Sequence, residues 1–290
     1  MQVLQGLEPL SGRYQGYIVD LWGTVHDGIT VFPGAADCLA RLRKAGKRIV
    51  FLSNAPRPAA VVHEQLRAFG IADEWHDGVV TSGEVTRQLL LRRGDAEIQA
   101  RFPWLGTSGT KVLHIGGDHD LPLYEGLDLI LTDRPEEARF IMNTGPDDRR
   151  GKNDPAPYTA LLEQAAALKL PMICANPDME VVKGGVRLIC AGLLASIYEQ
   201  KGGEVHQIGK PYPEVYAPVF EKLGLAPSDC LAIGDALATD IRGAKAAGAD
   251  SLWVLGGIHG EHLADNPQLA QAEADGAGLS PAATVPMFRW

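Results

Sequence analysis

The sequence predicts an α/β protein whose core is a Rossmann-like, doubly wound parallel sheet with a second α/β module inserted into it. Short apolar runs rich in β-branched residues alternate with helical stretches, which is typical of a parallel sheet covered by helices on both faces. Several helical stretches stop at a glycine, which readily adopts the left-handed conformation that ends a helix. The 290 residues are 46% hydrophobic and 22% charged, enough to fill more than one apolar core.

The core strands and helices can be placed in order along the chain. Buried strands are expected at residues 17–21 (YIVDL), 48–52, 78–81, 230–233 and 251–255. Amphipathic helices are expected at residues 34–45, 58–69, 213–223 and 240–247, followed by Gly46, Gly70, Gly224 and Gly248.

A second α/β set occupies the middle of the chain. Strands are expected at residues 112–115, 128–131, 139–142 and 171–175, and helices at 135–138 and 156–168. We therefore assign residues 1–85 and 179–290 to the core and residues 86–178 to an inserted cap. The tail after Asn266 ends in MFRW, which is apolar enough that we expect it to dock on the core.

Composition excludes several classes of function. The net charge of −9 argues against nucleic-acid and anionic-membrane partners, which require a basic face. The four cysteines form no C-x-x-C pair, as expected for reduced thiols in a cytoplasmic protein. The first residues lack the pattern of a signal peptide, and no apolar run approaches the ~20 residues of a membrane span. We expect a soluble, cytoplasmic protein.

Polar residues follow several predicted core strands where each strand ends. Asp20 ends the first strand, Ser53 and Asn54 follow the second, and Asp235 follows the strand at residues 230–233. Ligands of open parallel sheets bind outside the carboxyl ends of the strands, so these residues are expected to converge. Lys210, in a Gly-Lys-Pro turn before a helix, adds a positive charge.

These residue types suit the hydrolysis of a phosphate monoester. A carboxylate such as Asp20 can attack phosphorus and form an aspartyl-phosphate. Asp20 and Asp235 together suit a hard cation that prefers oxygen ligands. Lys210 can neutralise charge on the transferring group, and Ser53 can hold its oxygens. Asp240 is placed to orient Lys210 or a metal-bound water.

Four motifs in order resemble those of the haloacid dehalogenase (HAD) superfamily. They lie at residues 20–24 (DLWGT), 51–56 (FLSNAP), 208–213 (IGKPYP) and 233–243 (IGDALATDIRG). The likeness extends over residues ~15 to ~260 and is most similar to subclass IIA, with its large α/β cap, which includes NagD-like, pyridoxal-phosphate and p-nitrophenyl phosphatases.

The resemblance implies a Mg²⁺-dependent phosphatase that acts on a small phosphorylated metabolite. It also implies a cap that closes over the site and often mediates homodimers. The implied roles are a nucleophile, Asp20; metal ligands, Asp20, Asp235 and the backbone carbonyl of Trp22; phosphate ligands, Ser53, Asn54 and Lys210; supporting groups, Thr24 and Asp240; and substrate contacts at the cap–core junction, Asn176 and Asp178.

The sequence departs from the family pattern at Trp22. The usual motif has an aspartate there, whose carboxyl group protonates the leaving oxygen and later activates water. Tryptophan retains the backbone carbonyl and cannot transfer that proton, and general acid–base catalysis is worth roughly 10² to 10⁴ in rate. Three explanations stay open: a substrate with a good leaving group, an acid supplied by the cap, or weakened catalysis. His26 and Asp27 lie too far beyond the strand end to be obvious substitutes.

The same residues also permit other interpretations. A non-catalytic protein that binds a phosphorylated metabolite remains an alternative, whereas a nicotinamide-binding enzyme is excluded because no G-x-G-x-x-G follows a first strand. Residues 114–120 (HIGGDHD) and 143–148 (NTGPDD) are interpreted first as turns at strand ends. A metal site at the former and a substrate contact at the latter are the alternatives. The remaining histidines have no partner spacing and are assigned to surface or core, namely His63, His76, His206, His259 and His262.

Overall fold

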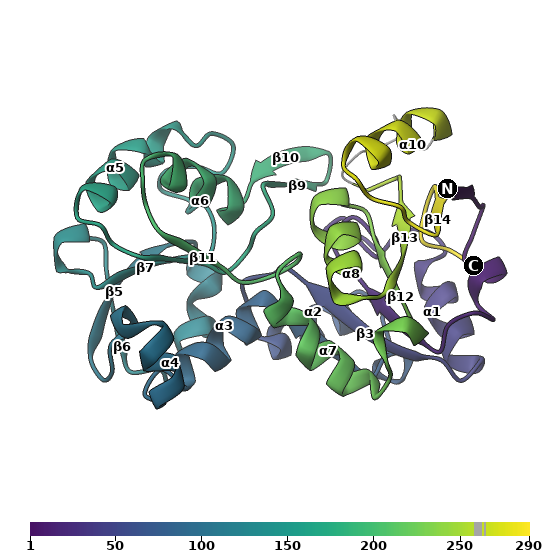
Figure 1. Cartoon of the computed structure of the whole chain (residues 1–290), viewed down its shortest axis with the longest axis horizontal. Coiled ribbons are helices and arrows are strands. Elements are labelled where there is room, and N and C mark those ends of the chain that lie inside the picture. The colour runs from purple at the N-terminus through teal and green to yellow at the C-terminus, as the bar shows by residue number, and fades with distance from the viewer. Residues whose placement is uncertain (258–262, 264) are drawn as a thin grey trace.

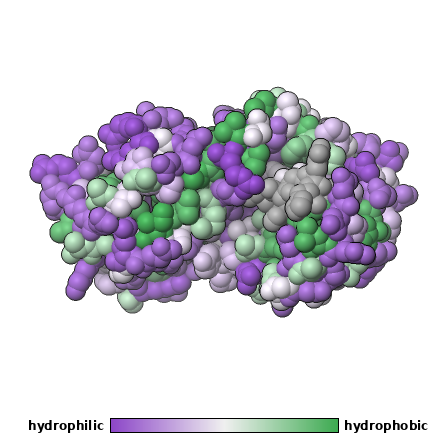
Figure 2. All heavy atoms as spheres, turned by 90° about the horizontal axis from the view of Figure 1, so that it is seen from above, coloured by the Kyte–Doolittle hydropathy of each residue, from purple (hydrophilic) through white to green (hydrophobic). Residues whose placement is uncertain are grey.

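The computed structural model describes residues 1–257, 263 and 265–290, and it consists of two α/β modules side by side (Figure 1). His259 and His262 lie outside the described residues. Polar side chains cover the outer ends of both modules, as Figure 2 shows from above. Within the described part of the chain, no helix is both long and apolar enough to span a bilayer.

The core is a seven-stranded sheet in which every neighbouring pair is parallel, in the order β1-β14-β13-β12-β2-β3-β4. The strands are β1 (Gln2–Val3), β2 (Gly16–Val19), β3 (Arg48–Ser53), β4 (Gly78–Thr81), β12 (Cys230–Gly234), β13 (Asp250–Val254) and β14 (Ala283–Val285). From β2 the chain adds β3 and β4 on one side and later β12, β13 and β14 on the other. The predicted doubly wound sheet is confirmed, and its direction reverses between β2 and β12.

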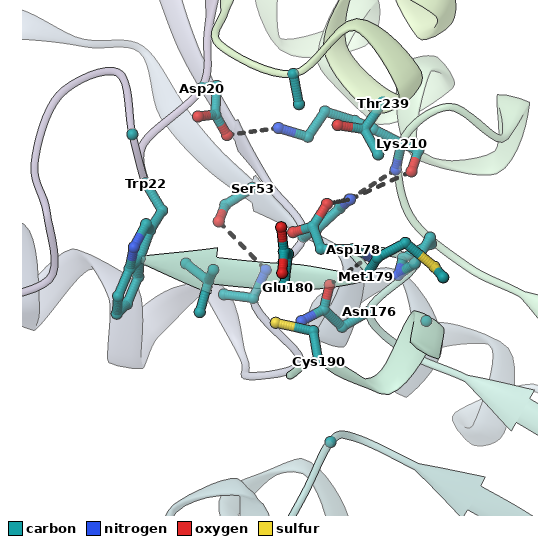
Figure 3. Close-up of a pocket in the computed structure, with 18 of the residues that line it drawn as sticks. Asp20, Trp22, Ser53, Asn176, Asp178, Met179, Glu180, Cys190, Lys210 and Thr239 are labelled. Carbon is teal, nitrogen blue, oxygen red and sulfur yellow. Dashed lines mark hydrogen bonds and ion pairs between the residues drawn. The ribbon is translucent and has the colours of Figure 1, made fainter. Parts of the chain in front are cut away.

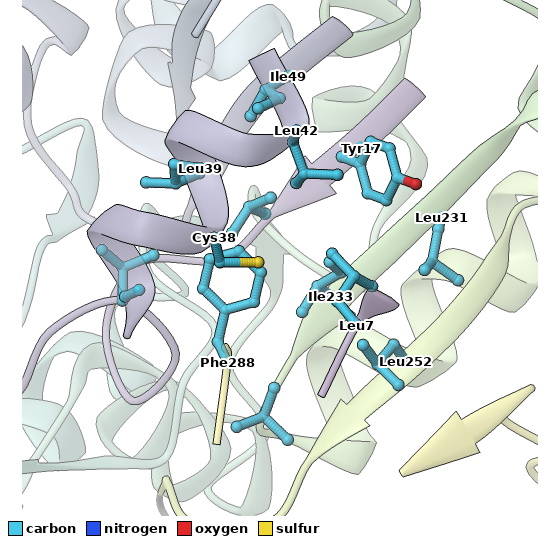
Figure 4. Packing of buried hydrophobic residues seen from close by; sticks show 14 of the residues in the cluster. Leu7, Tyr17, Cys38, Leu39, Leu42, Ile49, Leu231, Ile233, Leu252 and Phe288 are labelled. Atoms are coloured by element: carbon cyan, nitrogen blue, oxygen red, sulfur yellow. The ribbon is translucent and has the colours of Figure 1, made fainter. Parts of the chain in front are cut away.

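Alternation along the strands places apolar residues on both faces of this sheet. Tyr17 and Val19 of β2 pack with helix α1 (Ala35–Lys44) and helix α2 (Ala59–Ala68), as part of the cluster in Figure 4. Ile18, which points to the other face, belongs to the cluster that includes α7 (Tyr216–Leu223) and α8 (Arg242–Ala247). A central strand buried on both faces explains why YIVDL is a continuous apolar run up to Asp20.

The second module is a five-stranded parallel sheet in the order β11-β8-β7-β5-β6. Its strands are β5 (Thr110–Ile115), β6 (Leu129–Thr132), β7 (Phe140–Asn143), β8 (Met172–Cys174) and β11 (Val205–Gln207). Buried residues of α5 (Thr159–Ala167) and α6 (Ala191–Gln200) pack in one cluster with this sheet. The opposite face belongs to the cluster that also holds residues of α3 (Ser82–Leu91) and α4 (Ala96–Arg101).

The predicted cap boundary at residue 178 needs revision. Strand β11 pairs with β8, and α6 packs on the cap sheet, so both belong to the second module although they follow residue 178. Sequence gave no sign of this because β11 is only three residues long and none of them is fully buried. We propose that the inserted module runs from about residue 86 to residue 207.

Two further features lie outside the predicted elements. An antiparallel hairpin of β9 (Glu180–Lys183) and β10 (Val186–Ile189) lies between the modules (Figure 1). The chain ends pair through β1 and β14, after helix α10 (Pro267–Gly276), and Phe288 is 1% exposed in the core. The apolar tail therefore docks as expected: the backbone N–H of Leu7 donates to the Arg289 carbonyl at 2.8 Å.

Candidate active site

The predicted strand-end residues converge where the winding of the core sheet reverses. Asp20 follows β2, Asp235 follows β12 and Ser53 ends β3, and these three strands are neighbours in the sheet. The carboxyl ends of parallel strands share one edge, so three residues more than 30 positions apart in sequence become neighbours. Lys210 enters from the segment after β11, which brings the chain back to the core.

A buried ionic cluster forms at this edge. The Lys210 Nζ lies 2.5 Å from Asp20 Oδ1 and 2.7 Å from Asp240 Oδ1, as the dashed contact to Asp20 in Figure 3 shows. Asp240 lies in the turn Leu237–Ile241, where its Oδ2 accepts the Ala236 N–H at 3.0 Å. None of Asp20, Lys210 and Asp240 is more than 6% exposed.

Burial and neighbouring charge shift the pKa values of these groups in opposite ways. Burial alone would lower the pKa of Lys210, but the carboxylates of Asp20, Asp240 and Asp178 outweigh it and hold that pKa well above its ordinary value. Burial raises the pKa of Asp20 to about 7, against the opposing charge of Lys210. The lysine is thus firmly charged, while the carboxylates around it outnumber it.

The oxygen atoms at this edge fit a hard divalent cation. Asp20 Oδ2 is buried and has no hydrogen-bond partner among the described residues. One carboxylate oxygen from each of Asp20, Asp235 and Asp240 lies within 4.8 Å of the other two. A Cβ on Gly23 or on Gly257 would lie 2.1 Å from Asp235 Oδ2, so only glycine leaves room for this carboxylate. Asp240 differs from the other two in that Lys210 contacts one of its oxygens and the Ala236 N–H the other.

Asn54 holds the lysine segment in place. Its Oδ1 accepts the backbone N–H of Lys210 at 2.7 Å, and its Nδ2 donates to the Lys210 carbonyl at 3.2 Å and to Asp178 Oδ1 at 2.9 Å. Asn54 was predicted to bind phosphate. In the structure its side-chain amide instead bonds the Lys210 backbone and Asp178. Ser53 Oγ accepts the Ala55 N–H at 3.2 Å, which leaves its hydroxyl hydrogen to donate to a ligand.

Of the other predicted site residues, Asp178 and Asn176 line the pocket and Thr24 does not. Asp178 and Asn176 line the pocket at the cap–core junction, where Asn176 Oδ1 accepts the Asp178 N–H at 3.0 Å. Burial raises the pKa of Asp178. Thr24 is 1% exposed and does not line the pocket, and its buried Oγ1 has no hydrogen-bond partner among the described residues.

Trp22 faces the pocket from the side opposite Lys210 (Figure 3). Its indole Nε1–H donates to the carbonyl of Val182 in β9 at 2.8 Å. The ring meets His26 edge to face, with centroids 5.6 Å apart, and a Cβ on Gly28 would lie 2.3 Å from it. The indole is therefore clamped between a loop of the core and the hairpin.

His26 and Asp27 are engaged elsewhere. His26 Nδ1 accepts the Gly28 N–H at 3.0 Å, and burial lowers the pKa of this imidazole to about 4. Asp27 Oδ1 accepts the N–H groups of Thr30 and Ile29, and these bonds hold the pKa of Asp27 below its usual range. Near neutral pH, His26 is uncharged and Asp27 is ionised, so neither holds an acidic proton.

The site opens into a cavity of about 1180 Å³ between the modules. Core, cap and hairpin all line it, and its apolar lining residues include Trp22, Met179, Val181 and Leu188. Arg57, after β3, donates to Asp120 of the cap at 3.3 Å, and both residues line the cavity. The cavity is large enough for a phosphate and a leaving group of metabolite size.

One cluster escaped the sequence interpretation. His63, Asp73 and His76 bring their ligand atoms within 4.8 Å, although their spacing matched no metal motif. Asp73, however, is already held by the Arg67 guanidinium, whose Nη2 lies 2.7 Å from Asp73 Oδ2. In the cap, His114 Nε2 lies 3.1 Å from Thr144 Oγ1, and both segments interpreted as turns reach the cavity, which His119 and Thr144 help to line.

A parallel α/β core with a lysine-bridged acidic pocket beneath a second α/β module is the arrangement of a capped hydrolase. Family models agree: residues 17–129 match a model described as haloacid dehalogenase-like hydrolase, and residues 207–275 match a related HAD-hydrolase-like model.

Similar proteins cover nearly the whole chain. A haloacid dehalogenase-like hydrolase from Brucella suis is 34% identical, with a TM-score of 0.82 over 99% of this chain and 100% of that one. Mouse chronophin is 28% identical over 87% of this chain and 84% of its own length. A glycerol phosphate phosphatase from Mycobacterium tuberculosis in complex with magnesium is 25% identical, with a TM-score of 0.63 over 89% of this chain and 73% of that one. The chain belongs to the haloacid dehalogenase-like hydrolases of subclass IIA.

Proposed function

We propose that the protein is a Mg²⁺-dependent phosphatase that hydrolyses a small phosphorylated metabolite through an aspartyl-phosphate on Asp20. The observation that carries the proposal is the Asp20 carboxylate. One of its oxygens is fixed by Lys210, and the other is buried without a partner among the described residues. A buried polar atom without a partner costs about 1–3 kcal/mol, so a ligand is expected to complete it.

The chain's own residues supply most of the reaction. An Asp20 oxygen attacks phosphorus as the ester P–O bond breaks, and water then attacks the aspartyl-phosphate to release phosphate and the free carboxylate. Lys210 offsets the charge of the transferring group, and the Ser53 hydroxyl donates to one of its oxygens. Asp20, Asp235 and the Trp22 carbonyl would hold Mg²⁺, which when bound neutralises charge on the phosphoryl oxygens. Asn54 and Asp240 keep Lys210 in position.

The direct test is hydrolysis of p-nitrophenyl phosphate and of a panel of acyl, aryl and alkyl phosphates. We expect phosphate release that requires Mg²⁺ and stops with EDTA. Inorganic phosphate should bind the Mg²⁺-loaded protein in the calorimeter. Tight binding of phosphorylated metabolites without turnover on any member of the panel would favour the alternative, a non-catalytic phosphometabolite-binding protein.

Trp22 favours substrates whose leaving groups depart without a proton. Its indole N–H is donated to the Val182 carbonyl, and His26 and Asp27 hold no acidic proton near neutral pH. Acyl, enol and aryl phosphates release stable anions, whereas an alkoxide requires protonation as it leaves. We expect alkyl phosphates to react about 10²- to 10⁴-fold more slowly than p-nitrophenyl phosphate, the range that general acid catalysis covers.

Replacement of Trp22 tests this inference. Trp22→Asp should raise alkyl-phosphate turnover relative to Trp22→Asn, which has a similar size and no acidic proton. Equal rates for the two variants, both folded and both binding Mg²⁺, would contradict the missing-acid explanation.

We also propose that the protein is cytoplasmic and forms a homodimer. The four cysteines are buried and unpaired, and burial raises the pKa of each thiol, which suits a reducing cytoplasm. A homodimer formed through the cap is the assembly suggested by the resemblance. Light scattering after gel filtration would test it.

A further inference from the structure

Trp22 joins two parts of the molecule that are 160 residues apart in sequence. On the core side, Gly28 and His26 confine the ring. On the other side, the indole N–H holds the Val182 carbonyl at 2.8 Å. A ring fixed on both sides transmits a movement of its backbone to the hairpin instead of rotating freely.

A second contact joins the same loop to the hairpin. Ile29 is 55% exposed, yet its side chain lies against the hairpin turn, where a Cβ on Gly184 would be 2.6 Å from Ile29 Cδ1. Gly184 has a φ of +54°, which favours glycine on its own account. The loop at residues 22–31 therefore touches the hairpin at the middle of β9 and at its tip.

The backbone of Trp22 lies within the ionic site. Asp20 is two residues earlier, and Gly23 packs so closely on Asp235 that its Cβ position is 2.1 Å from Oδ2. The Gly23 N–H also donates to the His26 carbonyl at 2.9 Å, which ties this backbone to the loop that holds the ring. A ligand that binds both Asp20 and Asp235 must therefore fix the backbone of Trp22 and Gly23, which lies beside both.

We propose that Trp22 is a positioning residue that couples ligand binding at Asp20 and Asp235 to docking of the β9–β10 hairpin. The coupling rests on the proposed phosphatase function, because Mg²⁺ and phosphate are its ligands. The hairpin contributes Glu180, Val181 and Leu188 to the cavity wall, so its docking completes the side that faces the leaving group. Linkage requires the effect to be reciprocal. The site at Asp20 and Asp235 should therefore bind its ligands more tightly when the hairpin is docked.

Hydrogen–deuterium exchange of residues 180–189 in the full chain tests the coupling, with Mg²⁺ and inorganic phosphate as the probes. In the wild type, the two ligands together should slow exchange of the hairpin several-fold. Trp22→Phe keeps a ring and loses the N–H, so the free variant should exchange about fivefold faster, the equivalent of one neutral hydrogen bond. Its affinity for Mg²⁺ and phosphate, measured by calorimetry, should fall by a similar factor.

Matched variants separate the coupling from a loss of fold. Trp75→Phe changes a half-buried tryptophan packed against the core cluster away from the hairpin, and should change neither quantity. Ile29→Ala should give a smaller shift of both in the same direction as Trp22→Phe.

The outcomes distinguish the two proposals. Normal ligand affinity with unchanged hairpin exchange in Trp22→Phe would overturn the coupling and leave the phosphatase proposal standing. Failure of the wild type to bind Mg²⁺ and phosphate at all would overturn both.

Discussion

The two parallel sheets of this protein both end in polar residues, but the described residues partner them differently at the two edges. At the core edge, Lys210 is shared by Asp20 and Asp240, and one Asp20 oxygen has no partner among the described residues. At the cap edge, Asn143 Nδ2 donates to the Ala191 carbonyl, and Asp147 pairs with Arg150 three residues on.

The two edges differ in how the charge of their acids is compensated. The cap edge also has an unpartnered atom within the described residues, Asn143 Oδ1, but it belongs to a neutral amide. The cap acid Asp147 is satisfied locally by Arg150 and by the Arg150 backbone N–H at 2.7 Å. In the core, the lysine that Asp20 and Asp240 share comes from a distant segment, and the carboxylates exceed its positive charge.

The largest expected effect is at the core edge. Asp20→Asn removes the attacking carboxylate with little change in shape, so turnover of p-nitrophenyl phosphate with Mg²⁺ should fall by ~10⁴ or more. Circular dichroism should show an intact fold. Retention of a tenth of the activity would mean that the core edge is not the nucleophilic site.

Lys210→Met should cost both stability and activity. It leaves Asp20 and Asp240 as buried carboxylates without their lysine, which is expected to destabilise the fold by ~3–5 kcal/mol in urea unfolding at neutral pH. The loss should shrink in acid, where the carboxylates can be protonated. Lys183→Met, at an exposed hairpin position, serves as the control and should stay within about 0.5 kcal/mol of the wild type.

His26 should make the core loop sensitive to acid. Burial lowers the pKa of His26 to about 4, so the unfolded chain, with a histidine pKa near 6.5, binds more protons between these values. Stability should therefore fall as pH decreases through this window, by ~2 kcal/mol at pH 5 from this residue. His26→Asn, which can still accept the Gly28 N–H, should remove that part of the slope. An unchanged slope would mean that His26 is not buried as a neutral group.

The smallest effect is expected at the cap edge. Asp147→Asn weakens a local pair with Arg150 and should cost about 1 kcal/mol of stability, with turnover unchanged. A large loss of turnover would remove the contrast between the two edges, because it would give the cap edge a catalytic role.

Much of the core and its site could be predicted from sequence, because both depend on local signals. Runs such as YIVDL mark strands buried on both faces, and Asp20 and Asp235 follow their strands directly. The rule that parallel strands share a carboxyl edge then brings these residues together. The convergence with Lys210 is what the motifs indicated.

The contacts that position the site could not be predicted in the same way. Nothing near Asn54 indicates that its amide would hold Lys210 and Asp178, over 100 positions away. The β9–β10 hairpin has no alternating apolar pattern, and the consecutive residues from Glu180 to Lys183 all line the cavity. The bond from Trp22 to Val182 depends on the tertiary arrangement alone.

The pairing of the chain ends has a consequence for biosynthesis. All cap strands lie between Thr110 and Gln207, so the cap sheet can assemble while the remainder of the core is still being translated. The core sheet must wait for β12, β13 and finally β14 before β1 has a neighbour to join. During that interval β2 and β3 are an incomplete sheet with an open edge, the stage at which a nascent chain is most exposed to aggregation.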